Sequence, residues 1–380
     1  MIPRGKLAIS FFELIGALTD CFIKKNSGEL IPSQALYGKS MFCLSARTGL
    51  DLTLRTLNLV PGATVLATSI NIPDMFSILK AHQLVTVPIA IDKQTLELNL
   101  QELEDAITPS CKVILIAHLF GAIANLDEVV LFAKKHQLII IEDCAQAFNH
   151  NYKGHPATDV SLFSFGLIKT NTCLTGAMIC FNNQLIFDNV KLLNQQLPVQ
   201  DTKKYLGKIF KALAIKVITL KWIYTLLYIT TQRLNKDFDA VLSGFTKGFP
   251  GDNVMEKIKF RPCYANLRLL YKRTHLMNDQ SITDRVEVAL KILDKIPMPM
   301  RIGALNQNHS HWVIPIASDN PIALITSLRE KGIDATTKAS SLINIMDENK
   351  AGENGDLNLE ELVYVPIDET VINGLMDHGS

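Results

Sequence analysis

The chain has 380 residues, of which 48% are apolar and 20% are charged, and its formal net charge is +1. This length and composition predict a large domain plus a smaller one and exclude an intrinsically disordered chain. A nearly balanced charge gives no overall reason to expect a nucleic-acid partner, so any electrostatic specialisation must be local. Seven cysteines without a CxxC pair favour reduced, buried thiols.

The N-terminus carries Arg4 and Lys6 ahead of an apolar run over residues 7–18, which is the charge order of a signal peptide. Glu13 interrupts the run, and no small-x-small cleavage site follows cleanly. We therefore expect a cytoplasmic protein.

Residues 45–190 alternate between helices and short buried strands. Helices are predicted over residues 45–59, 74–82, 100–107 and 126–136, and strands over 64–68, 85–91, 112–117, 138–142 and 161–165. Val-, Ile- and Leu-rich strands separated by helices predict an α/β domain with a mostly parallel sheet covered on both faces.

Residues 201–236 differ in character, with eight basic residues against one acid, Asp201. Their apolar residues recur at three- and four-residue steps, which predicts a long amphipathic helix or a helix pair. The longest charge-free run, residues 222–232, is too short to span a bilayer.

The rest of the chain predicts a smaller α+β unit. Gly244, Gly248, Pro250 and Gly251 are expected to break the helical segment, and a further helix is expected over residues 262–277. A helix over 281–294, a strand over 312–316, a helix over 321–331 ended by Gly332 and a strand over 363–365 follow. We predict a large domain over residues 1–256, and a linking helix and small C-terminal domain over 257–380.

The predicted strand ends carry the residues with chemical potential, whereas GxGxxG, GxxxxGK[ST] and GxSxG motifs are absent from the sequence. Asp143 and Gln146 follow one strand, and Lys169 follows another, at the edge where doubly wound sheets bind ligands. The helix that starts after Ser45 offers free N–H groups to a phosphate. A lysine for a Schiff base, an aspartate for a pyridine nitrogen and a phosphate site are what pyridoxal phosphate requires.

Four stretches in this order resemble the motifs of the DegT/DnrJ/EryC1/StrS sugar aminotransferases. They are Ser-Ala-Arg-Thr-Gly-Leu at 45–50, His-Leu-Phe-Gly at 118–121, Glu-Asp-Cys-Ala-Gln-Ala at 142–147 and Phe-Ser-Phe-Gly-Leu-Ile-Lys at 163–169. The resemblance implies a pyridoxal-phosphate-dependent transferase of fold type I, acting as a homodimer whose sites are completed across the interface.

The resemblance also implies roles for individual residues. Lys169 would bind the cofactor covalently and shuttle the proton, Asp143 would pair with the pyridine nitrogen, and Gln146 would lie against the ring. The predicted phosphate ligands are Ser164, Arg47 and Thr48, together with Lys259 of the partner subunit, which precedes Phe260-Arg261 where the family commonly has an asparagine.

The implied activity is transfer of an amino group, from glutamate by resemblance, to a nucleotide-linked keto-sugar in surface-glycan or amino-sugar biosynthesis. Retention of Lys169 argues against the family's dehydrating branch, which has a histidine there. Two departures motivate an alternative, a catalytically silent relative that acts as a membrane-associated or partner-binding protein. Ala46-Arg47 replaces the family's Gly-Thr, and residues 71–75 lack the aromatic that often stacks on the cofactor.

Other interpretations stay open from the sequence. Lys169 alone is typical of a surface lysine, Asp143 of a helix cap, Gln146 of a buried hydrogen-bonding partner, and His118 of either a satisfied core histidine or a catalytic one. The His309–His311 pair favours a solvated loop over a metal site. Three interpretations of the 201–236 segment stay open. It packs against its own domain or the dimer mate, it contacts a membrane surface or a lipid-linked substrate, or it binds a sugar-nucleotide diphosphate.

Overall fold

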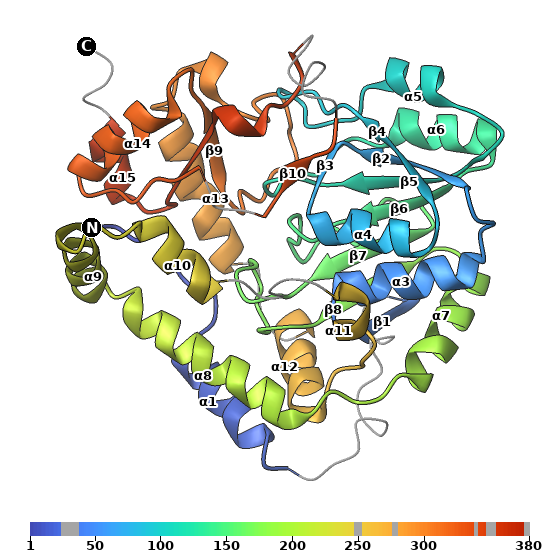
Figure 1. Cartoon of the computed structure of the whole chain (residues 1–380), viewed down its shortest axis with the longest axis horizontal. Coiled ribbons are helices and arrows are strands. Elements are labelled where there is room, and N and C mark those ends of the chain that lie inside the picture. Colours follow the sequence, from blue (N-terminus) through green and yellow to red (C-terminus); the bar gives the residue numbers. More distant parts are fainter. Residues whose placement is uncertain (24–37, 247–252, 276–279, 338–340, 347–354, 376–380) are drawn as a thin grey trace.

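The computed structural model (Figure 1) describes residues 1–23, 38–246, 253–275, 280–337, 341–346 and 355–375. Its central sheet has seven strands in the order β1-β8-β7-β6-β5-β2-β4. These are β1 (Ser40–Cys43), β2 (Thr64–Thr68), β4 (Val85–Ile89), β5 (Cys111–Ala117), β6 (Ile139–Asp143), β7 (Val160–Ser164) and β8 (Ala177–Phe181). The strands from β4 to β7 pair in parallel, and β8 runs antiparallel to both of its neighbours. The predicted mostly parallel α/β sheet is confirmed.

The helices and strands predicted over residues 45–165 all occur, with each end within two residues of its predicted position. The helices are α3 (Ala46–Leu57), α4 (Pro73–Ala81), α5 (Leu100–Ala106) and α6 (Asp127–His136). Strands β1 and β8 and helix α7 (Gln184–Gln196) were not predicted from the sequence. Nor was the short strand β3 (Ile70–Asn71), which pairs with β10 (Ile343–Asn344).

Helices cover both faces of the sheet because the strand side chains alternate between two apolar cores. On β2, Val65 and Ala67 belong to the core shared with α3, α4 and α7. Leu66, between them, belongs to the core shared with α5 and α6. This double burial explains why the strands are continuously apolar.

The 201–236 segment forms a helix pair, α8 (Thr202–Ile218) and α9 (Lys221–Arg233), bent by 85° at residues 219–220. Among the described residues, no single helix is long and apolar enough to cross a membrane, although this bent pair meets that criterion when its two helices are taken together. The expected break at Gly244 is wrong, since α10 (Phe238–Thr246) continues through it. The other expected breaks, at residues 248, 250 and 251, lie outside the described residues.

Helices α1 (Phe11–Asp20), α11 (Val254–Lys257) and α12 (Tyr264–His275) complete this part of the molecule. The helix predicted over 262–277 is α12, and its predicted end lies outside the described residues. Helices α1, α8 and α12 share an apolar core with the neighbouring face of β1, β7 and β8.

The C-terminal part has its own apolar core, as the α+β pattern predicted. It packs α13 (Gln280–Leu293), α14 (Pro321–Glu330) and α15 (Thr370–Leu375) on an antiparallel pair, β9 (Ile314–Ala317) and β11 (Leu362–Val365). Short 3₁₀ helices occur at Met298–Met300 and Leu359–Glu361. The N-terminus joins this part, because Ile2 bridges to Ile333 and Arg4 pairs with the fully buried Asp334. The division between residues 256 and 257 stays a prediction.

Candidate active site

Lys169 lies on the turn that follows β7, half-buried against the ring of Trp312. Its backbone N–H donates to the carbonyl of Gly166 (3.0 Å), and its Nζ lies 4.1 Å from the centroid of the Trp312 ring. The indole N–H of Trp312 donates to the carbonyl of Ile168 (3.0 Å). A Cβ placed on Gly166 would lie 3.7 Å from Ser164 Oγ and 3.9 Å from Lys169 Cγ. Ser164, Lys169 and Trp312 therefore border the same turn.

The electrostatic surroundings of Lys169 favour a partly uncharged amine. Burial lowers the pKa of Lys169 from 10.5 to about 8, Asp143 opposes this effect, and Arg47 adds to the lowering. At pH 7 about a tenth of the amine is then uncharged, which is the nucleophilic form. An ordinary surface lysine would have a far smaller uncharged fraction. Lys169 is thus not a fully exposed surface lysine, and its role in cofactor binding stays a prediction.

Asp143 ends β6 and is 5% exposed. Its Oδ2 accepts a hydrogen bond from Asn71 Nδ2 (3.1 Å), and its Oδ1 accepts one from the N–H of Ala145 (3.1 Å). The alternative of a helix cap is wrong, because residues 144–159, all of them described, contain no helix. Each oxygen of this carboxylate accepts one of these hydrogen bonds and retains a further lone pair for a donor.

The segment over residues 71–75 supplies polar partners in place of the aromatic that the family often has. Asn71 bonds to Asp143, as described above, and Asp74 pairs with Nε of Arg47 at 2.5 Å. From the sequence, this segment was seen only as a departure from the family motif. The spacing of residues within the segment does not reveal these partners, because each contact joins elements that become neighbours only when the chain folds.

Thr48 and Lys259 already have hydrogen-bond or ion-pair partners within the chain. Thr48 Oγ1 donates to the carbonyl of Ile258 (3.0 Å), and the Thr48 N–H donates to Oγ of Ser45 (3.1 Å). Both Thr48 donors are therefore engaged within the chain. Lys259 pairs with Glu256 (3.2 Å) and is half exposed, beside a surface cavity of about 610 Å³. The phosphate roles of both residues stay predictions.

Gln146 holds the loop that contains the His-Leu-Phe-Gly motif. Its Oε1 accepts a hydrogen bond from the N–H of Phe120 (2.8 Å), and the side chain is 8% exposed. The N–H of Trp312 donates to the carbonyl of Phe120 (2.9 Å), and the N–H of Ser310 donates to that of Gly121 (2.8 Å). The motif loop thus supports the segment that carries Trp312. Contact between Gln146 and a cofactor ring stays a prediction.

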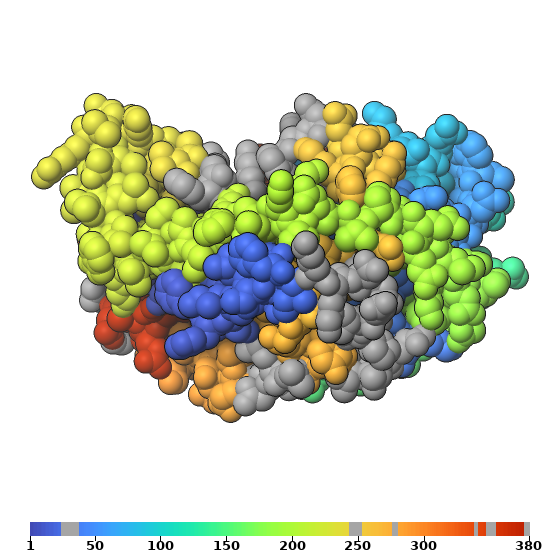
Figure 2. Space-filling view, turned by 90° about the horizontal axis from the view of Figure 1, so that it is seen from below, coloured from blue at the N-terminus to red at the C-terminus, as the bar shows by residue number. Residues whose placement is uncertain are grey.

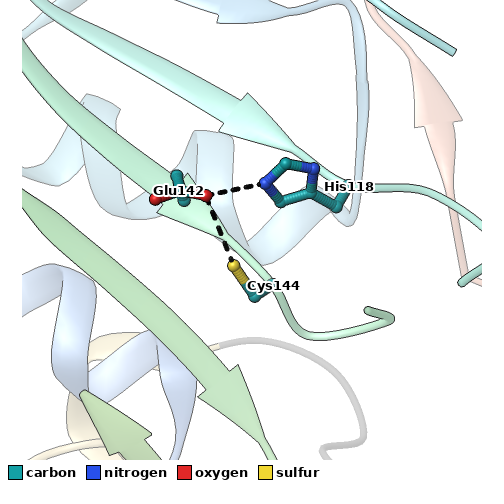
Figure 3. Close-up of side chains that lie close together, drawn as sticks. All are labelled: His118, Glu142 and Cys144. Carbon is teal, nitrogen blue, oxygen red and sulfur yellow. Dashed lines mark hydrogen bonds and ion pairs between the residues drawn. The ribbon is translucent and has the colours of Figure 1, made fainter. Parts of the chain in front are cut away.

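Glu142, next to Asp143, is fully buried and charged. Figure 3 shows it between His118 and Cys144. Burial opposes its ionisation, but hydrogen bonds, that from His118 foremost among them, outweigh burial and lower the pKa of Glu142 from 4.5 to about 2. His118 accepts the N–H of Ala124 at Nδ1 (3.1 Å), so Nε2 carries the proton that it donates to Glu142 (2.9 Å). The other donors are Cys144, Tyr152, Thr158, Ser161 and the backbone N–H of His155.

His118, Glu142 and Cys144 lie close enough together to ligate a metal ion, with ligand atoms within 4.8 Å of one another. However, each oxygen of Glu142 already accepts hydrogen bonds from three donors, which fills the acceptor positions of the carboxylate. The cluster therefore ties β5, β6 and β7 together beneath Asp143. His118 is the satisfied core histidine of the two alternatives left open by the sequence.

The expected solvated loop around His309 and His311 is wrong. The two rings stack with centroids 3.9 Å apart, and the N–H of His311 donates to Nδ1 of His309 (2.9 Å). His311 is 7% exposed, and burial followed by the charge of Arg285 lowers its pKa to about 4. The segment is buried because it packs on the motif loop, a long-range contact that the local polar sequence does not indicate.

Comparisons with known proteins agree with this geometry. Residues 38–217 match the model of the DegT/DnrJ/EryC1/StrS aminotransferase family. A relative in Methanocaldococcus jannaschii, the uncharacterized protein MJ1066, is 32% identical over 152 residues, and the alignment covers 39% of each chain. The chain thus spans well under half of the length of that relative.

Several solved structures, aminotransferases among them, have a similar fold. Helicobacter pylori PseC, an aminotransferase involved in the biosynthesis of pseudoaminic acid, aligns with a TM-score of 0.67 at 16% identity, over 99% of this chain and 98% of its own. The sugar aminotransferase CalS13 from Micromonospora echinospora aligns with a TM-score of 0.63 at 18% identity, over 99% and 100%. NtdA from Bacillus subtilis, solved with bound PMP, aligns with a TM-score of 0.64 at 16% identity, over 99% of this chain and 83% of its own. The family match over residues 38–217 confirms the predicted resemblance to the DegT/DnrJ/EryC1/StrS aminotransferases.

Proposed function

We propose that the protein is a pyridoxal-phosphate-dependent aminotransferase that moves an amino group from an amino-acid donor, glutamate by family resemblance, to a nucleotide-linked keto-sugar. The observation that carries the proposal is the electrostatic coupling of Lys169 to Asp143 at the carboxyl ends of neighbouring strands. The family match supports the reaction class. The sugar, the nucleotide linkage and the donor rest on the resemblance.

The residues present fit the cofactor. The Lys169 amine has a lowered pKa suited to covalent attachment, and the buried Asp143 carboxylate retains acceptor capacity for a ring N–H. Ser164 borders the Lys169 turn and would donate to the phosphate. Arg47 and Thr48 lie in the first turn of helix α3 and, by the family resemblance, would contact the phosphate. Lys259 would act from the partner subunit of a homodimer.

Within this site the chain's own groups have distinct tasks. Pyridoxal phosphate supplies, when bound, an electron sink for negative charge that develops on the substrate. Asp143 would provide the negative charge that keeps a ring nitrogen protonated, and Asn71 donates a hydrogen bond that holds the carboxylate in position. Lys169 would hold and return the proton moved in each half-reaction, since a pKa of about 8 lies near the working pH.

Borohydride reduction of the purified protein with added cofactor, followed by peptide mass spectrometry, tests the attachment. We expect the label on Lys169, its loss in Lys169→Ala, and its retention in the matched variant Lys135→Ala, at an exposed lysine on α6. Absence of label from Lys169 would contradict the proposal. A panel of keto-sugar nucleotides with glutamate, analysed for amino-sugar products, tests the substrate class. A labelled protein that aminates none of them would favour the catalytically silent alternative.

A further inference from the structure

Helix α8 is apolar on its outer as well as its inner face. Its inner residues, spaced by three and four, are buried in the core shared with α1 and α12. Its outward stripe follows the same spacing through Gly207, Phe210, Ala214 and Val217, with Phe210 55% and Val217 44% exposed. The exposed Lys203 and Lys221 lie at the two ends of this stripe. A helix that faced only water would carry polar residues along it.

Helix α1, which packs beside α8, also has apolar residues on its outward face. Its outward residues include Phe12 (88% exposed) and Ile15 (51%), and Phe22 (74%) follows its C-terminus. Its two acids face the protein, since Glu13 pairs with Arg273 and Asp20 pairs with Arg268 (2.9 Å). The charged groups of this helix are therefore neutralised inside, and its aromatic groups face outward.

Helix α9 extends the surface and carries more apolar groups. Trp222 is 70% exposed and Leu226 61% exposed, one turn apart, with Ile229 next along the same stripe. Lys216 ties α8 to α1, because its Nζ donates to the carbonyl of Ile9 (2.5 Å) and lies 5.0 Å from the centroid of the Phe11 ring. Figure 2 shows α1, α8 and α9 along one face of the molecule.

We propose that α1, α8 and α9 form a membrane-binding face that lies in the headgroup region of an anionic bilayer. Residues 201–236 carry eight basic residues and one acid, and Lys203, Lys204, Lys221, Arg233 and Lys236 are exposed. Exposed aromatic and aliphatic groups bordered by lysines match the composition of helices that lie at a membrane interface. The lysines attract anionic lipid, while the apolar groups enter the boundary of the acyl chains.

The same charge disfavours a second copy of this chain as the occupant. In a twofold dimer formed through this patch, its five exposed basic residues would face an equal set. The 85° bend between α8 and α9 disfavours a helix that crosses the bilayer. A helix pair lying along an anionic surface meets both constraints. The test measures lipid binding and does not depend on catalysis.

Vesicle sedimentation of the full chain tests the proposal. We expect binding to vesicles of phosphatidylcholine with 30% phosphatidylglycerol, roughly tenfold weaker binding to pure phosphatidylcholine, and weaker binding at high salt. The triple variants Phe12→Ser/Phe22→Ser/Trp222→Ser and Lys203→Glu/Lys204→Glu/Lys221→Glu should each reduce the partition coefficient by about tenfold or more. Circular dichroism and thermal melting check that each variant is folded.

A matched control exists on α6, which also exposes an apolar residue beside lysines. Leu131 is 66% exposed, and Lys134 and Lys135 are exposed next to it. The variant Leu131→Ser/Lys134→Glu/Lys135→Glu changes similar chemistry elsewhere and should leave vesicle binding unchanged. Equal loss of binding in this control and in the face variants would overturn the assignment of the face.

Tryptophan fluorescence gives a second readout, since the chain has two tryptophans. In Trp312→Phe, Trp222 is the remaining reporter, and its emission should shift to the blue and be quenched by brominated lipid in anionic vesicles. No binding to anionic vesicles, or binding without a change at Trp222, would overturn the proposal. Conversion of a dimer to a monomer by the Phe12, Phe22 and Trp222 substitutions would instead assign the face to a second copy.

Discussion

Replacing Glu142 with glutamine removes a buried charge on which a whole hydrogen-bond cluster depends. The carboxylate is inaccessible to solvent and accepts from five side chains and one backbone N–H. Glutamine keeps one acceptor oxygen but turns an NH₂ group toward groups that are themselves donors. Unsatisfied buried donors cost about 1–3 kcal/mol each, and broken buried charge networks cost about 3–5 kcal/mol. We expect Glu142→Gln to lower the free energy of unfolding by about 3–5 kcal/mol at pH 7.

The pKa of Glu142 gives this prediction a pH dependence with a definite sign. The folded-state pKa of about 2 lies below the ordinary value of 4.5, so the stabilisation is fully present above about pH 5 and is lost as the pH falls from 4.5 toward 2. The gap between the two values corresponds to about 3 kcal/mol, at about 1.4 kcal/mol for each pH unit. The stability difference between wild type and variant should therefore narrow over this interval.

Urea unfolding followed by circular dichroism, at steps from pH 7.5 to the lowest pH at which both proteins fold, measures that difference. Glu104→Gln on the exposed face of α5 is the matched control and should change stability by less than about 0.5 kcal/mol throughout. A Glu142→Gln destabilisation below about 1 kcal/mol at pH 7, or one that does not narrow on acidification, would refute the reasoning.

Three further predictions concern the site and its support. Asp143→Asn should lower the pKa of Lys169 below about 8, moving the pH midpoint of borohydride-trapped cofactor attachment downward; an upward shift would contradict the electrostatic assignment. Gly121→Ala should cost roughly 2 kcal/mol or more in thermal or urea unfolding, because φ is +103° and the new Cβ would lie 2.5 Å from the backbone nitrogen of Trp312. Trp312 fluorescence should change with it, and an unchanged spectrum would count against the packing described. Asp334→Asn, at a fully buried carboxylate paired with arginine, should destabilise the protein by about 3 kcal/mol, and urea unfolding that shows a loss below 1 kcal/mol would disagree.

The large-domain sheet could be predicted because its strands are short runs of β-branched residues that are buried on both faces. Strands β1 and β8 escaped prediction. Strand β1 is four residues long and pairs with β8, which lies far away in the sequence. The Ser, Ala, Met and Cys in the two strands give a weak β-pattern. The 201–236 segment was predictable as helix from its periodicity. The side of this helix that faces outward could not be predicted, because apolar residues occupy both sides. The helices that pack against α8 decide which side is covered.

The sequence by itself predicted that Lys169 and Asp143 lie near one another, since each follows a predicted parallel strand and such strands end at a common edge. Only the tertiary structure placed Asn71 on Asp143 and Asp74 on Arg47, and brought Trp312 to Lys169. Those contacts join segments that are tens to more than a hundred residues apart. The periodicity of a segment indicates which of its residues are buried, whereas the residues that cover them depend on how the whole chain folds.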